Sequence, residues 1–451
     1  MHAPARLLAR LLRAVSRRLG RSGGTTAPGR LLLALSPRAL RRMAAGLDEG
    51  SVLVSATNGK TTTAAMVAAA LERDGRAVVH NRAGSNMSWG VATALLDAGA
   101  ARGQIGLFEV DEAWLPAVAR DLRPRVLLLA NLFRDQLDRY GELETLADRW
   151  ADLLAGEDAP PALVLNADDP LVADLGRDRE GVTYFGVEDD AQALPELQHA
   201  ADSKHCRNCG TAYLYDAVYL GHLGRYRCPG CGRERPQPQV AATRVELEGM
   251  SGSRIELRTP AGELTLRLPA PGLYNVYNAV AAAATALELG VPLATVGEAL
   301  ESFAGAFGRV ETIPVRGREL SILLIKNPAG ANEVLRTLTL EDDSLDLWLA
   351  LNDRIADGRD VSWIWDADFE LLRGRVRRIT CSGTRAEEMA VRLKYAELDA
   401  QIEVARDLGD SLDRALDSAA GSRLYALPTY TALLELRDLL SRRGLADRWS
   451  A

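Results

Sequence analysis

The cysteines carry the clearest chemical pattern in the sequence. Four of the five form two C-x-x-C pairs, separated by eighteen residues: Cys206, Cys209, Cys228 and Cys231. Two such pairs are typical of a zinc ribbon, in which four thiolates surround Zn²⁺ as a tetrahedron. Because four cysteines leave no open coordination position, we expect a structural metal, to which the nearby histidines at 205 and 222 are surplus. Cysteines used for metal rather than disulfides favour a reducing, cytoplasmic compartment.

A polar string between an apolar run and an Ala-rich stretch has the composition of a phosphate-binding loop. Ser51–Ser55 is typical of a buried parallel strand and residues 61–73 of a helix. Backbone N–H groups at the start of such a helix bind phosphate oxygens, Lys60 would add a positive charge between the β- and γ-phosphates, and the Thr61 hydroxyl can join an Mg²⁺ shell. A glycine turn without a nucleotide is the alternative. The predicted phosphate contacts are Thr57, Asn58, Gly59, Lys60, Thr61 and Thr62.

The length and net charge of the chain limit the classes of function that it can have. A chain of 451 residues allows two or three domains, and a net charge of −7 argues against a nucleic-acid partner, because phosphate backbones bind basic faces. No apolar run approaches the roughly 20 residues that span a bilayer. The basic, amphipathic stretch at 6–19 lacks the apolar centre of a secretory signal. It is either a surface helix packed through its leucines or a helix resting on an anionic membrane surface.

Strand-like and helical stretches alternate along the chain. Strands are predicted at 105–110, 126–130, 162–166 and 182–185, with helices such as 143–155 between them, which indicates a mainly parallel sheet covered on both faces. Alternating patterns at 244–248, 254–258 and 263–268 predict antiparallel hairpins, and 275–289 a helix. A second α/β series follows, at 321–325, 345–351, 376–381 and 423–427. The predicted divisions are a basic amphipathic segment at 1–45, a central domain at 46–311 with the ribbon inserted around 203–238, and a C-terminal α/β domain at 312–451.

The string T-N-G-K-T-T-T at residues 57–63 resembles the phosphate loop of the Mur ligase superfamily, T-G-T-N-G-K-T-T. Ala56 stands where that family has glycine. Alanine disfavours a positive φ, so this departure from the family pattern would affect the backbone geometry of the loop at residue 56. The resemblance implies an α/β fold with a central P-loop ATPase domain and a C-terminal domain, and it implies ATP and Mg²⁺ as cofactors.

Two strings after the phosphate loop extend the resemblance. F-E-V-D-E at 108–112 implies that Glu109, at the end of a central strand, holds Mg²⁺; a solvated loop acid is the alternative. N-L-F-R-D-Q-L-D at 131–138 implies that Asn131 and Asp135 contact ATP or the metal. Gln136 stands where histidine is common in the family, so no acid–base role is carried onto it.

Three later strings continue it. L-Y-N-V-Y-N at 273–278 implies that Asn275 and Asn278 contact the adenine end, although helix capping explains Asn275 equally well. F-G-R-V-E at 307–311 implies that Arg309 touches the phosphates near the domain junction. K-N-P-A-G at 326–330 resembles a string of the C-terminal domain.

Two features narrow the resemblance. Only about fifty residues precede the phosphate loop, so we expect no N-terminal domain of the kind that binds a nucleotide sugar in the amino-acid-adding cell-wall ligases. The zinc ribbon is the second feature. The chain carries both this ribbon and the string N-D-R-I-A-D-G-R-D-V-S-W-I-W-D at 352–366. In these features it resembles the MurT family, the ligase subunits of lipid II isoglutaminyl synthase, and the resemblance covers nearly the whole chain after residue 45.

This resemblance implies amidation of the D-glutamate α-carboxylate in the lipid II stem peptide, through an acyl phosphate and ammonia. It also implies a separate glutaminase subunit, GatD, docked on the C-terminal domain, which contributes an acid to the partner's Cys–His pair. Asp357, Asp360 and Asp353 are the candidates, and loop capping is the alternative for each. Lipid II lies in the cytoplasmic leaflet, which would suit peripheral contact with the inner face of the membrane.

Other functions remain open from the sequence. An internal glutaminase is disfavoured, because Cys381 is the only cysteine outside the ribbon and all five histidines precede the C-terminal domain. The nearest alternative is another Mur-type amide ligase, either amino-acid-adding or similar to folylpolyglutamate synthase. A zinc-ribbon protein that binds nucleic acid and uses ATP as a switch is the alternative from another class, and the acidic net charge disfavours it.

Overall fold

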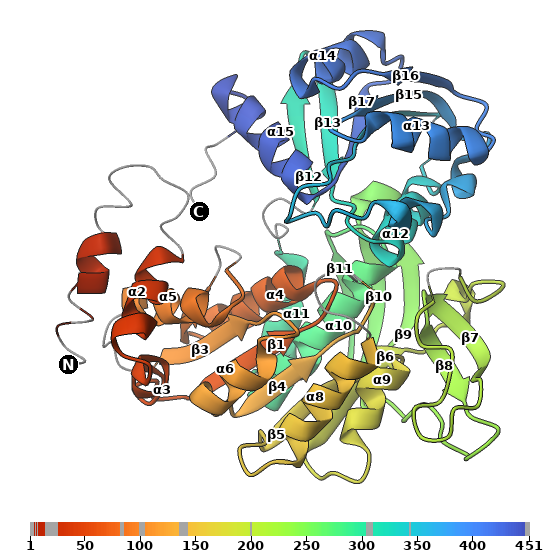
Figure 1. Ribbon diagram of the computed structural model, residues 1–451. Helices are drawn as coiled ribbons and strands as arrows, with labels where there is room; N and C mark the ends of the chain where they lie inside the picture. Colours follow the sequence, from red (N-terminus) through yellow and green to blue (C-terminus); the bar gives the residue numbers. More distant parts are fainter. Residues whose placement is uncertain are drawn as a thin grey trace.

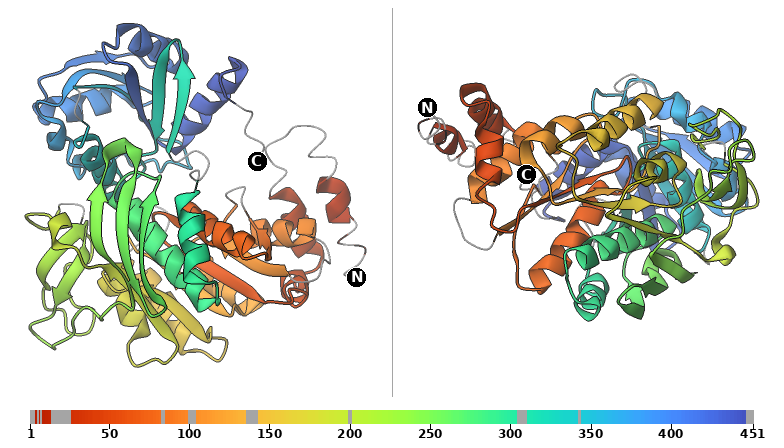
Figure 2. Two further views of the ribbon diagram at one scale, coloured as in Figure 1. Left: turned by 180° about the vertical axis from the view of Figure 1, so that it is seen from behind. Right: turned by 90° about the horizontal axis from the view of Figure 1, so that it is seen from below.

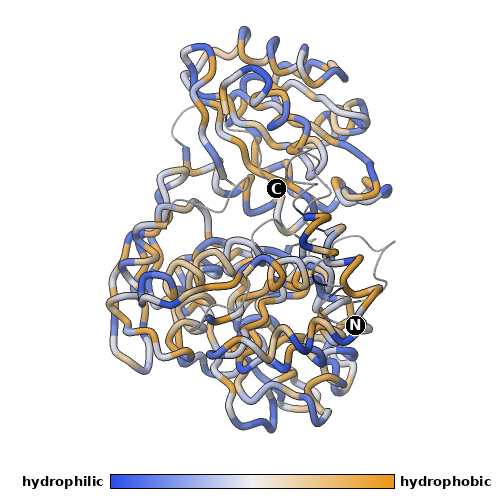
Figure 3. The backbone as a smooth tube through the Cα atoms, turned by 90° about the vertical axis from the view of Figure 1, so that its left-hand side faces the viewer, coloured by the Kyte–Doolittle hydropathy of each residue, from blue (hydrophilic) through white to orange (hydrophobic). Residues whose placement is uncertain are grey.

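The computed structural model describes residues 4, 6, 8–13, 26–81, 85–98, 104–134, 143–198, 201–303, 310–341 and 344–446. Two sheets, each covered by helices, lie one above the other in Figure 1, joined near α12. Hydrophobic stretches run through both lobes in Figure 3, in keeping with a separate core for each sheet. Among the described residues, no helix has the length and apolar character needed to cross a membrane.

The first sheet has nine strands and contains the phosphate loop. Six neighbouring strands pair in parallel from β2 to β6, β6 pairs in parallel with β9, and β9, β10 and β11 form antiparallel pairs. The predicted parallel sheet and hairpins are therefore confirmed. In spatial order the strands are β11 (Gly262–Leu268), β10 (Ser253–Thr259), β9 (Val240–Leu247), β6 (Val182–Val187), β5 (Ala162–Asn166), β4 (Val126–Leu129), β1 (Ser51–Ser55), β3 (Gln104–Glu109) and β2 (Ala77–His80).

Alternation along the central strands divides the core in two. Val52 and Val54 face one helical layer, whereas Leu53 faces the other, because successive side chains of a strand point to opposite faces. The first layer comprises α4 (Lys60–Arg73), α10 (Leu273–Glu288) and α11 (Leu293–Glu301). The second comprises α3 (Ala39–Ala44), α5 (Ser88–Ala98), α6 (Leu115–Leu122), α8 (Leu143–Ala155) and α9 (Pro170–Ala173). Burial on both faces explains why these strands are continuous apolar runs.

The cysteine-containing insertion forms its own small unit. It holds the two-stranded antiparallel sheet of β7 (Leu214–Leu220) and β8 (Leu223–Arg227), which lies to one side of the main sheet in Figures 1 and 2. The sequence patterns did not predict this hairpin, which lies between the two cysteine pairs.

The second sheet has six strands. All neighbours pair in parallel except β12 and β13. Their order is β12 (Val310–Val315), β13 (Arg318–Leu323), β17 (Arg423–Pro428), β14 (Leu345–Ala350), β15 (Val376–Ser382) and β16 (Gln401–Val404). One face packs α12 (Pro328–Leu338) and α13 (Ala386–Tyr395), and the other α14 (Leu408–Ser418) and α15 (Tyr430–Arg442). β12 begins at Val310, two residues before the predicted domain boundary, which stays a prediction.

The described region before β1 is helical. α2 spans Ala27–Leu35 with a proline at its start, where a helix needs no N–H from that residue. Gly29 permits α2 to approach α5, since a Cβ there would lie 1.8 Å from the Trp89 carbonyl oxygen. In the described part of the basic segment, Ala9 is buried and Arg13 pairs with Asp97 at 2.9 Å.

Candidate active site

The phosphate loop follows the carboxyl end of β1, and α4 starts at Lys60. Gly59 caps this helix with φ +82°, a backbone conformation in which glycine is favoured. A Cβ on Gly59 would lie 2.0 Å from the Asn278 side-chain oxygen, so the close approach of α10 also requires glycine. Ala56 is buried and is not among the residues with positive φ. The loop therefore accepts alanine there without strain.

The Lys60 ammonium lies between a carboxylate and a backbone carbonyl. Its Nζ is 2.8 Å from Glu112 Oε2 and also donates to the Ala56 carbonyl. The Lys60 and Glu112 side chains are 11% and 6% exposed, so water screens this ion pair little. The loop thus presents a buried ammonium and the N-terminus of α4 at one point, a combination suited to phosphate.

Glu109 ends β3, pairs across the sheet with Val54 of β1 and is 2% exposed. Asn81 holds its backbone on both sides: Asn81 Nδ2 donates to the Glu109 carbonyl and Asn81 Oδ1 accepts from the Glu109 N–H. Asp111 and Glu112 are also buried next along the chain. Carboxylate and hydroxyl oxygens are the ligands that Mg²⁺ takes, so Glu109 with Thr61 at the start of α4 fits the predicted metal.

Asn131 fastens the segment after β4 to the phosphate loop. Its side chain accepts from the Asn58 N–H at 2.9 Å and donates to the Asn58 carbonyl at 3.0 Å, while its own carbonyl accepts from the Thr57 N–H. Asn131 is therefore a positioning residue for the loop. Asp135 and Gln136 lie outside the described residues, as does Arg309.

The two asparagines of α10 form a relay behind the loop. Asn278 Oδ1 accepts from the Thr63 hydroxyl at 3.1 Å, and Asn278 Nδ2 donates to Asn275 Oδ1 at 3.1 Å. Asn275 Nδ2 in turn donates to the Pro271 carbonyl at 2.7 Å. Gly272 is the N-cap of α10, so Asn275 does not cap this helix.

A cavity of about 130 Å³ continues from the loop between the two lobes. Asn58 and Gly59 line one end, and the predicted adenine contacts Asn275 and Asn278 line a side. The wall is mostly apolar, as is usual for a small-molecule site. It is contributed by Phe133, Leu220, Leu223, Pro269, Ala270, Pro271, Phe303, Leu324, Ala329 and Val334. Leu220 and Leu223 flank the turn of the β7–β8 hairpin, so the insertion forms part of this cavity.

The C-terminal lobe reaches the phosphate loop directly. Asn327 Nδ2 donates to Asn58 Oδ1 at 2.9 Å, and Lys326 Nζ donates to the Thr57 carbonyl at 3.1 Å. Asn327 is also the N-cap of α12, where its Oδ1 accepts from the Gly330 N–H. The K-N-P-A-G string therefore joins the two lobes at the nucleotide loop.

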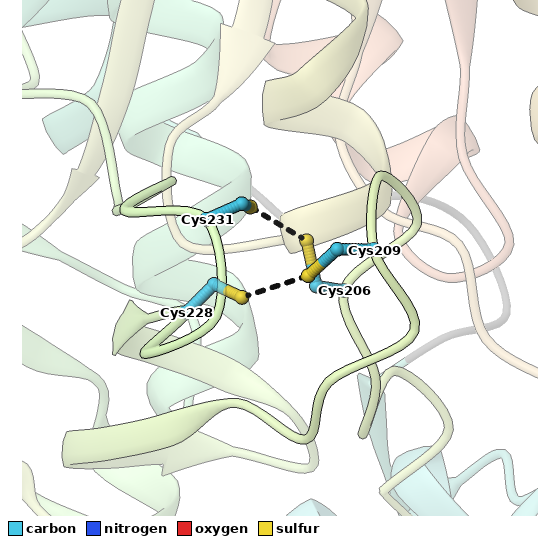
Figure 4. Close-up of side chains that lie close together, drawn as sticks. All are labelled: Cys206, Cys209, Cys228 and Cys231. Atoms are coloured by element: carbon cyan, nitrogen blue, oxygen red, sulfur yellow. Dashed lines mark hydrogen bonds between the residues drawn. The ribbon is translucent and has the colours of Figure 1, made fainter.

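The four cysteines converge from two facing loops (Figure 4). Their Sγ atoms all lie within 4.8 Å of one another, with Cys206–Cys231 at 3.6 Å and Cys209–Cys228 at 3.4 Å. Zn–S bonds of about 2.3 Å in a tetrahedron would place sulfurs about 3.8 Å apart, so the geometry fits. Hydrogen bonds from the Arg233 backbone and the Asn208 side chain lower the pKa of the Cys231 thiol to about 6, whereas burial raises the pKa of the Cys228 thiol to about 11.

The histidines near the ribbon are separate from this cluster. His222 is fully buried, with its Nε2 3.5 Å from Asp169 Oδ2 and its ring 4.6 Å from that of Phe133. Its role is to pack the hairpin turn against the segment after β4. His205 is exposed.

The three candidate acids of the C-terminal lobe have different environments. Asp357 is 7% exposed, and its carboxylate accepts from the Thr431 N–H at 2.7 Å and from the Thr431 hydroxyl. Asp360 is exposed and accepts from the Ser362 N–H at 2.8 Å, which lowers its pKa. Asp353 accepts from the Thr384 hydroxyl at 2.8 Å and from Arg385, and the Thr384 hydrogen bond lowers its pKa. The structure thus ties Asp357 inward and leaves Asp353 and Asp360 accessible.

Cys381 is not a nucleophile in this arrangement. It lies within β15, and burial raises its pKa to about 12. A thiol held neutral cannot serve as a glutaminase nucleophile.

Sequence reasoning missed several residues of the site. It did not single out Asn81, Glu112 as the partner of Lys60, or Lys326 and Asn327 as contacts of the loop. The acidic cluster after β3 was the available signal for Glu112. No local signal existed for Asn327 and Asn58, which lie 269 positions apart.

Comparison with known proteins decides the family. The Mur ligase middle domain matches residues 54–221 and the MurT ligase C-terminal domain matches residues 324–433. A relative from Staphylococcus aureus (strain N315), named lipid II isoglutaminyl synthase (glutamine-hydrolyzing) subunit MurT, is 33% identical over 96% of this chain and 97% of its own. The chain belongs to the MurT family. A MurT subunit from Streptococcus pneumoniae is 32% identical to this MurT-family chain, over 96% and 95% of the two lengths.

Solved structures of other proteins have the same Mur ligase fold as this MurT-family chain. A pseudomurein peptide ligase type C from Methanothermus fervidus has a TM-score of 0.69 at 23% identity and covers 87% of this chain and 79% of its own. A MurF ligase from Thermotoga maritima, solved in complex with ADP, has a TM-score of 0.63 at 13% identity, over 91% and 85%. The expected fold, a Mur ligase-type α/β architecture with a four-cysteine cluster, is confirmed.

Proposed function

We propose that this Mur-type ligase amidates the D-glutamate α-carboxylate of the lipid II stem peptide, using ATP and ammonia released from glutamine by a glutaminase subunit. The observation that carries the proposal is the similarity over nearly the full length to subunits named for lipid II isoglutaminyl synthesis. The phosphate loop supports it, because the buried Lys60 ammonium lies at the start of α4, where it pairs with the buried acid Glu112.

The chemistry proceeds in two balanced steps. A carboxylate oxygen attacks the γ-phosphorus of ATP, the bond to the β-phosphate oxygen breaks, and an acyl phosphate and ADP result. Ammonia then attacks the acyl carbon, phosphate leaves, and the nitrogen loses a proton to give the amide. Lys60 and the N–H groups at the start of α4 would neutralise the phosphoryl oxygens in the first step. Mg²⁺, held by Glu109 and Thr61, would supply further charge neutralisation.

We propose Zn²⁺ as the occupant of the four-cysteine cluster and a structural role for it. The sulfur spacing and the closed set of four thiolates support this. The ion would fasten the loop before β7 to the loop after β8, at the open end of the hairpin whose turn places Leu220 and Leu223 in the cavity wall.

We also propose that the C-terminal lobe docks the glutaminase subunit, GatD, and contributes an acid to its Cys–His pair. Asp353 and Asp360 are the better candidates, because Asp357 is engaged by Thr431. Asp353 lies at a surface hollow, beside Ile355, whose side chain is 74% exposed. An accessible acid next to an exposed apolar side chain is what a docking surface needs.

The proposed location is the cytoplasm, with contact at the inner membrane face. Leu8 and Leu11 are 50% and 56% exposed on the basic N-terminal segment, which supports a surface that meets lipid. The lipid-linked substrate lies at that face.

The decisive experiment is reconstitution. The chain is purified with its glutaminase subunit and incubated with lipid II, ATP, Mg²⁺ and glutamine, and the product is analysed by mass spectrometry. Amidation replaces OH by NH₂ and lowers the mass by about one unit. A product that carries an added amino acid would instead establish another Mur-type ligase. Asp353→Asn and Asp360→Asn then identify the docked acid, which supports turnover with glutamine but is not needed with free ammonia.

A further inference from the structure

Asp168 is a buried acid that follows the carboxyl end of β5 and belongs neither to the phosphate loop nor to the metal cluster. It is 0% exposed. Its Oδ1 accepts from Arg235 Nε at 2.6 Å. Its Oδ2 accepts from the Tyr277 hydroxyl at 2.6 Å and from the Val187 N–H at 2.9 Å. A buried carboxylate needs such a set of donors, and the set in turn fixes the position of every group that belongs to it.

Two of the bonds of Asp168 lead to the walls of the nucleotide cavity. Tyr277 on α10 lines the cavity. The backbone carbonyl of Asp168 accepts from the Gly224 N–H at 3.0 Å, and Gly224 directly follows Leu223, which lines the cavity from the β7–β8 hairpin. A single fully buried residue therefore joins two walls that come from different elements.

Tyr277 also lies next to Asn278, through which α10 meets the phosphate loop. Asn278 Oδ1 accepts from the Thr63 hydroxyl at 3.1 Å and would lie 2.0 Å from a Cβ on Gly59. Because the helix and the loop are so close, a displacement of α10 must also displace the loop. The hydrogen bond from Tyr277 to Asp168 restrains the helix at this point.

Arg235 connects Asp168 to the cysteine-containing insertion. It lies four residues after Cys231, and its backbone N–H donates to the Tyr226 carbonyl of β8 at 2.9 Å. Its side chain is 7% exposed and also donates to the Val187 carbonyl at 2.9 Å. The backbone of Arg235 thus belongs to the insertion, whereas its guanidinium lies against the main sheet. The insertion, the sheet and α10 meet at Asp168.

Gly186 in β6 provides the space for the Asp168–Arg235 pair. A Cβ at this position would lie 2.5 Å from Asp168 Oδ1 and 2.8 Å from Arg235 Nη2, closer than Cβ atoms approach other atoms in proteins. Gly186 is not among the glycines with positive φ. The close approach of the ion pair, rather than the backbone conformation, therefore requires glycine here.

We propose that Asp168 and Arg235 are positioning residues of the nucleotide site, through which the cysteine-containing insertion sets the affinity of the cavity for ATP. Asp168 holds Tyr277 and the hairpin turn in place, and Arg235 ties Asp168 to the insertion. Neither side chain is among those that line the cavity. This inference rests on the proposed nucleotide site and deepens it by naming residues that act on ATP binding without touching ATP.

Calorimetric titration of the full-length chain with ATP and Mg²⁺ tests the role of Asp168. Asp168→Asn removes the negative charge and one of the two acceptor oxygens. Asp346→Asn is the matched control, because Asp346 is 3% exposed and accepts from Arg377 at 3.0 Å and from the Ala420 N–H at 2.9 Å, at the start of β14 in the other sheet. Both variants should melt at a lower temperature. Only Asp168→Asn should bind ATP more weakly, by about threefold or more, as is typical of residues that modulate a site without contacting its ligand.

Gly186→Ala displaces the Asp168–Arg235 pair without removing a charge or a hydrogen-bonding group. Gly156→Ala is its control, since Gly156 has no positive φ and an added Cβ would have no neighbour closer than 3.5 Å. ATP affinity should fall in Gly186→Ala and stay unchanged in Gly156→Ala. These two variants keep the test decisive if Asp168→Asn does not fold.

A double-mutant cycle tests whether the insertion and α10 act through Asp168. Arg235→Lys keeps the charge but loses the planar fork of the guanidinium, and Tyr277→Phe keeps the ring but loses the hydroxyl. Losses of affinity that arise independently multiply, whereas losses that pass through one shared partner do not. The double variant should therefore bind ATP more tightly than the product of the two single losses predicts. Melting temperatures of the same proteins report stability separately.

The outcomes separate this inference from the proposed function. Wild-type ATP affinity in folded Asp168→Asn and Gly186→Ala would overturn the positioning role and leave the nucleotide site standing. Equal weakening in Asp346→Asn would assign the effect to general stability and would also overturn it. A cycle in which the two losses multiply would exclude Asp168 as the link between the insertion and α10. Absence of ATP binding to the wild type would overturn the nucleotide site itself.

Discussion

Lys60 Nζ lies 2.8 Å from Glu112 Oε2, so the cation of the phosphate loop is paired with a buried carboxylate from the segment after β3. A buried ammonium without a counter-charge would be costly, and Glu112 neutralises the Lys60 charge in this conformation of the loop. The same segment after β3 also buries Glu109 and Asp111, so several acids are removed from water on the strand next to the phosphate loop.

Lys60→Ala is expected to lower turnover by about a hundredfold or more, because a positioned charge on the phosphoryl oxygens is lost. It should also lower stability, by as much as about 3 kcal/mol, because Glu112 remains buried without its partner. Adding Glu112→Gln should restore the melting temperature but not the activity. ATP hydrolysis and thermal melting of the single and double variants check this; full activity in Lys60→Ala would refute the loop assignment.

Gly59→Ala should abolish nucleotide binding. Alanine at φ +82° costs about 1–2 kcal/mol, and its Cβ would lie 2.0 Å from the Asn278 oxygen, which must move. Gly75→Ala is the matched control, since Gly75 has φ +84° and nothing within 4 Å of an added Cβ. Both variants should lose similar backbone stability, but only Gly59→Ala should lose ATP affinity in calorimetry. Equal affinity in both would show that the Asn278 contact is unimportant.

Asn327→Ala should uncouple the two lobes. It removes the N-cap of α12, worth about 1 kcal/mol, and also the hydrogen bond to Asn58 at the phosphate loop. Asp407→Ala removes the N-cap of α14, where Asp407 accepts from the Asp410 N–H, but leaves the interface intact. Similar losses of melting temperature are expected, with a fall in kcat only for Asn327→Ala. A parallel fall in both would assign the effect to stability.

Removal of the ribbon metal should weaken nucleotide binding as well as the fold. Cys228→Ser breaks the cluster next to β8, which releases the hairpin that holds Leu220 and Leu223 in the cavity wall. We expect loss of bound zinc, a lower melting temperature and several-fold weaker ATP affinity. Cys381→Ala, at a buried cysteine outside the cluster, should leave zinc content and ATP affinity unchanged. If the zinc-free protein kept its ATP affinity, the ribbon would not be needed to maintain the nucleotide cavity.

Stability should depend on pH through Glu333. Burial raises its pKa to about 7 in the folded chain, against an ordinary value near 4.5 when unfolded. The folded state therefore keeps a proton that the unfolded state has lost, and stability falls as pH rises from about 4.5 to about 7. The loss is about 3 kcal/mol relative to Glu333→Gln, whose side chain does not titrate. Denaturant unfolding across this pH range, without nucleotide, measures this loss of stability. If the free energy of unfolding changed with pH equally in the two proteins, the raised pKa of Glu333 would be contradicted.

Local pattern was sufficient for much of the fold and for the site residues that lie in one string. β1, the glycine turn and α4 were predictable together because a buried run, a glycine and an Ala-rich helix are consecutive. The four cysteines were equally predictable, because the two-residue spacing within each C-x-x-C pair can be read directly from the sequence. Short edge strands such as β2 and β16 lacked a distinctive pattern, because they have partly exposed faces.

By itself the sequence determined the kinds of chemistry available: a phosphate loop, an acid after β3, four cysteines with metal-ligand spacing and a Mur-type order of strings. Only the tertiary structure decided which groups meet. Lys60 pairs with Glu112, Asn327 reaches Asn58, and Glu333 lies buried in a cavity between lobes, each across long chain separations. The physical reason is that burial and partner choice follow from the packing of two sheets and their helices, which no local window of residues contains.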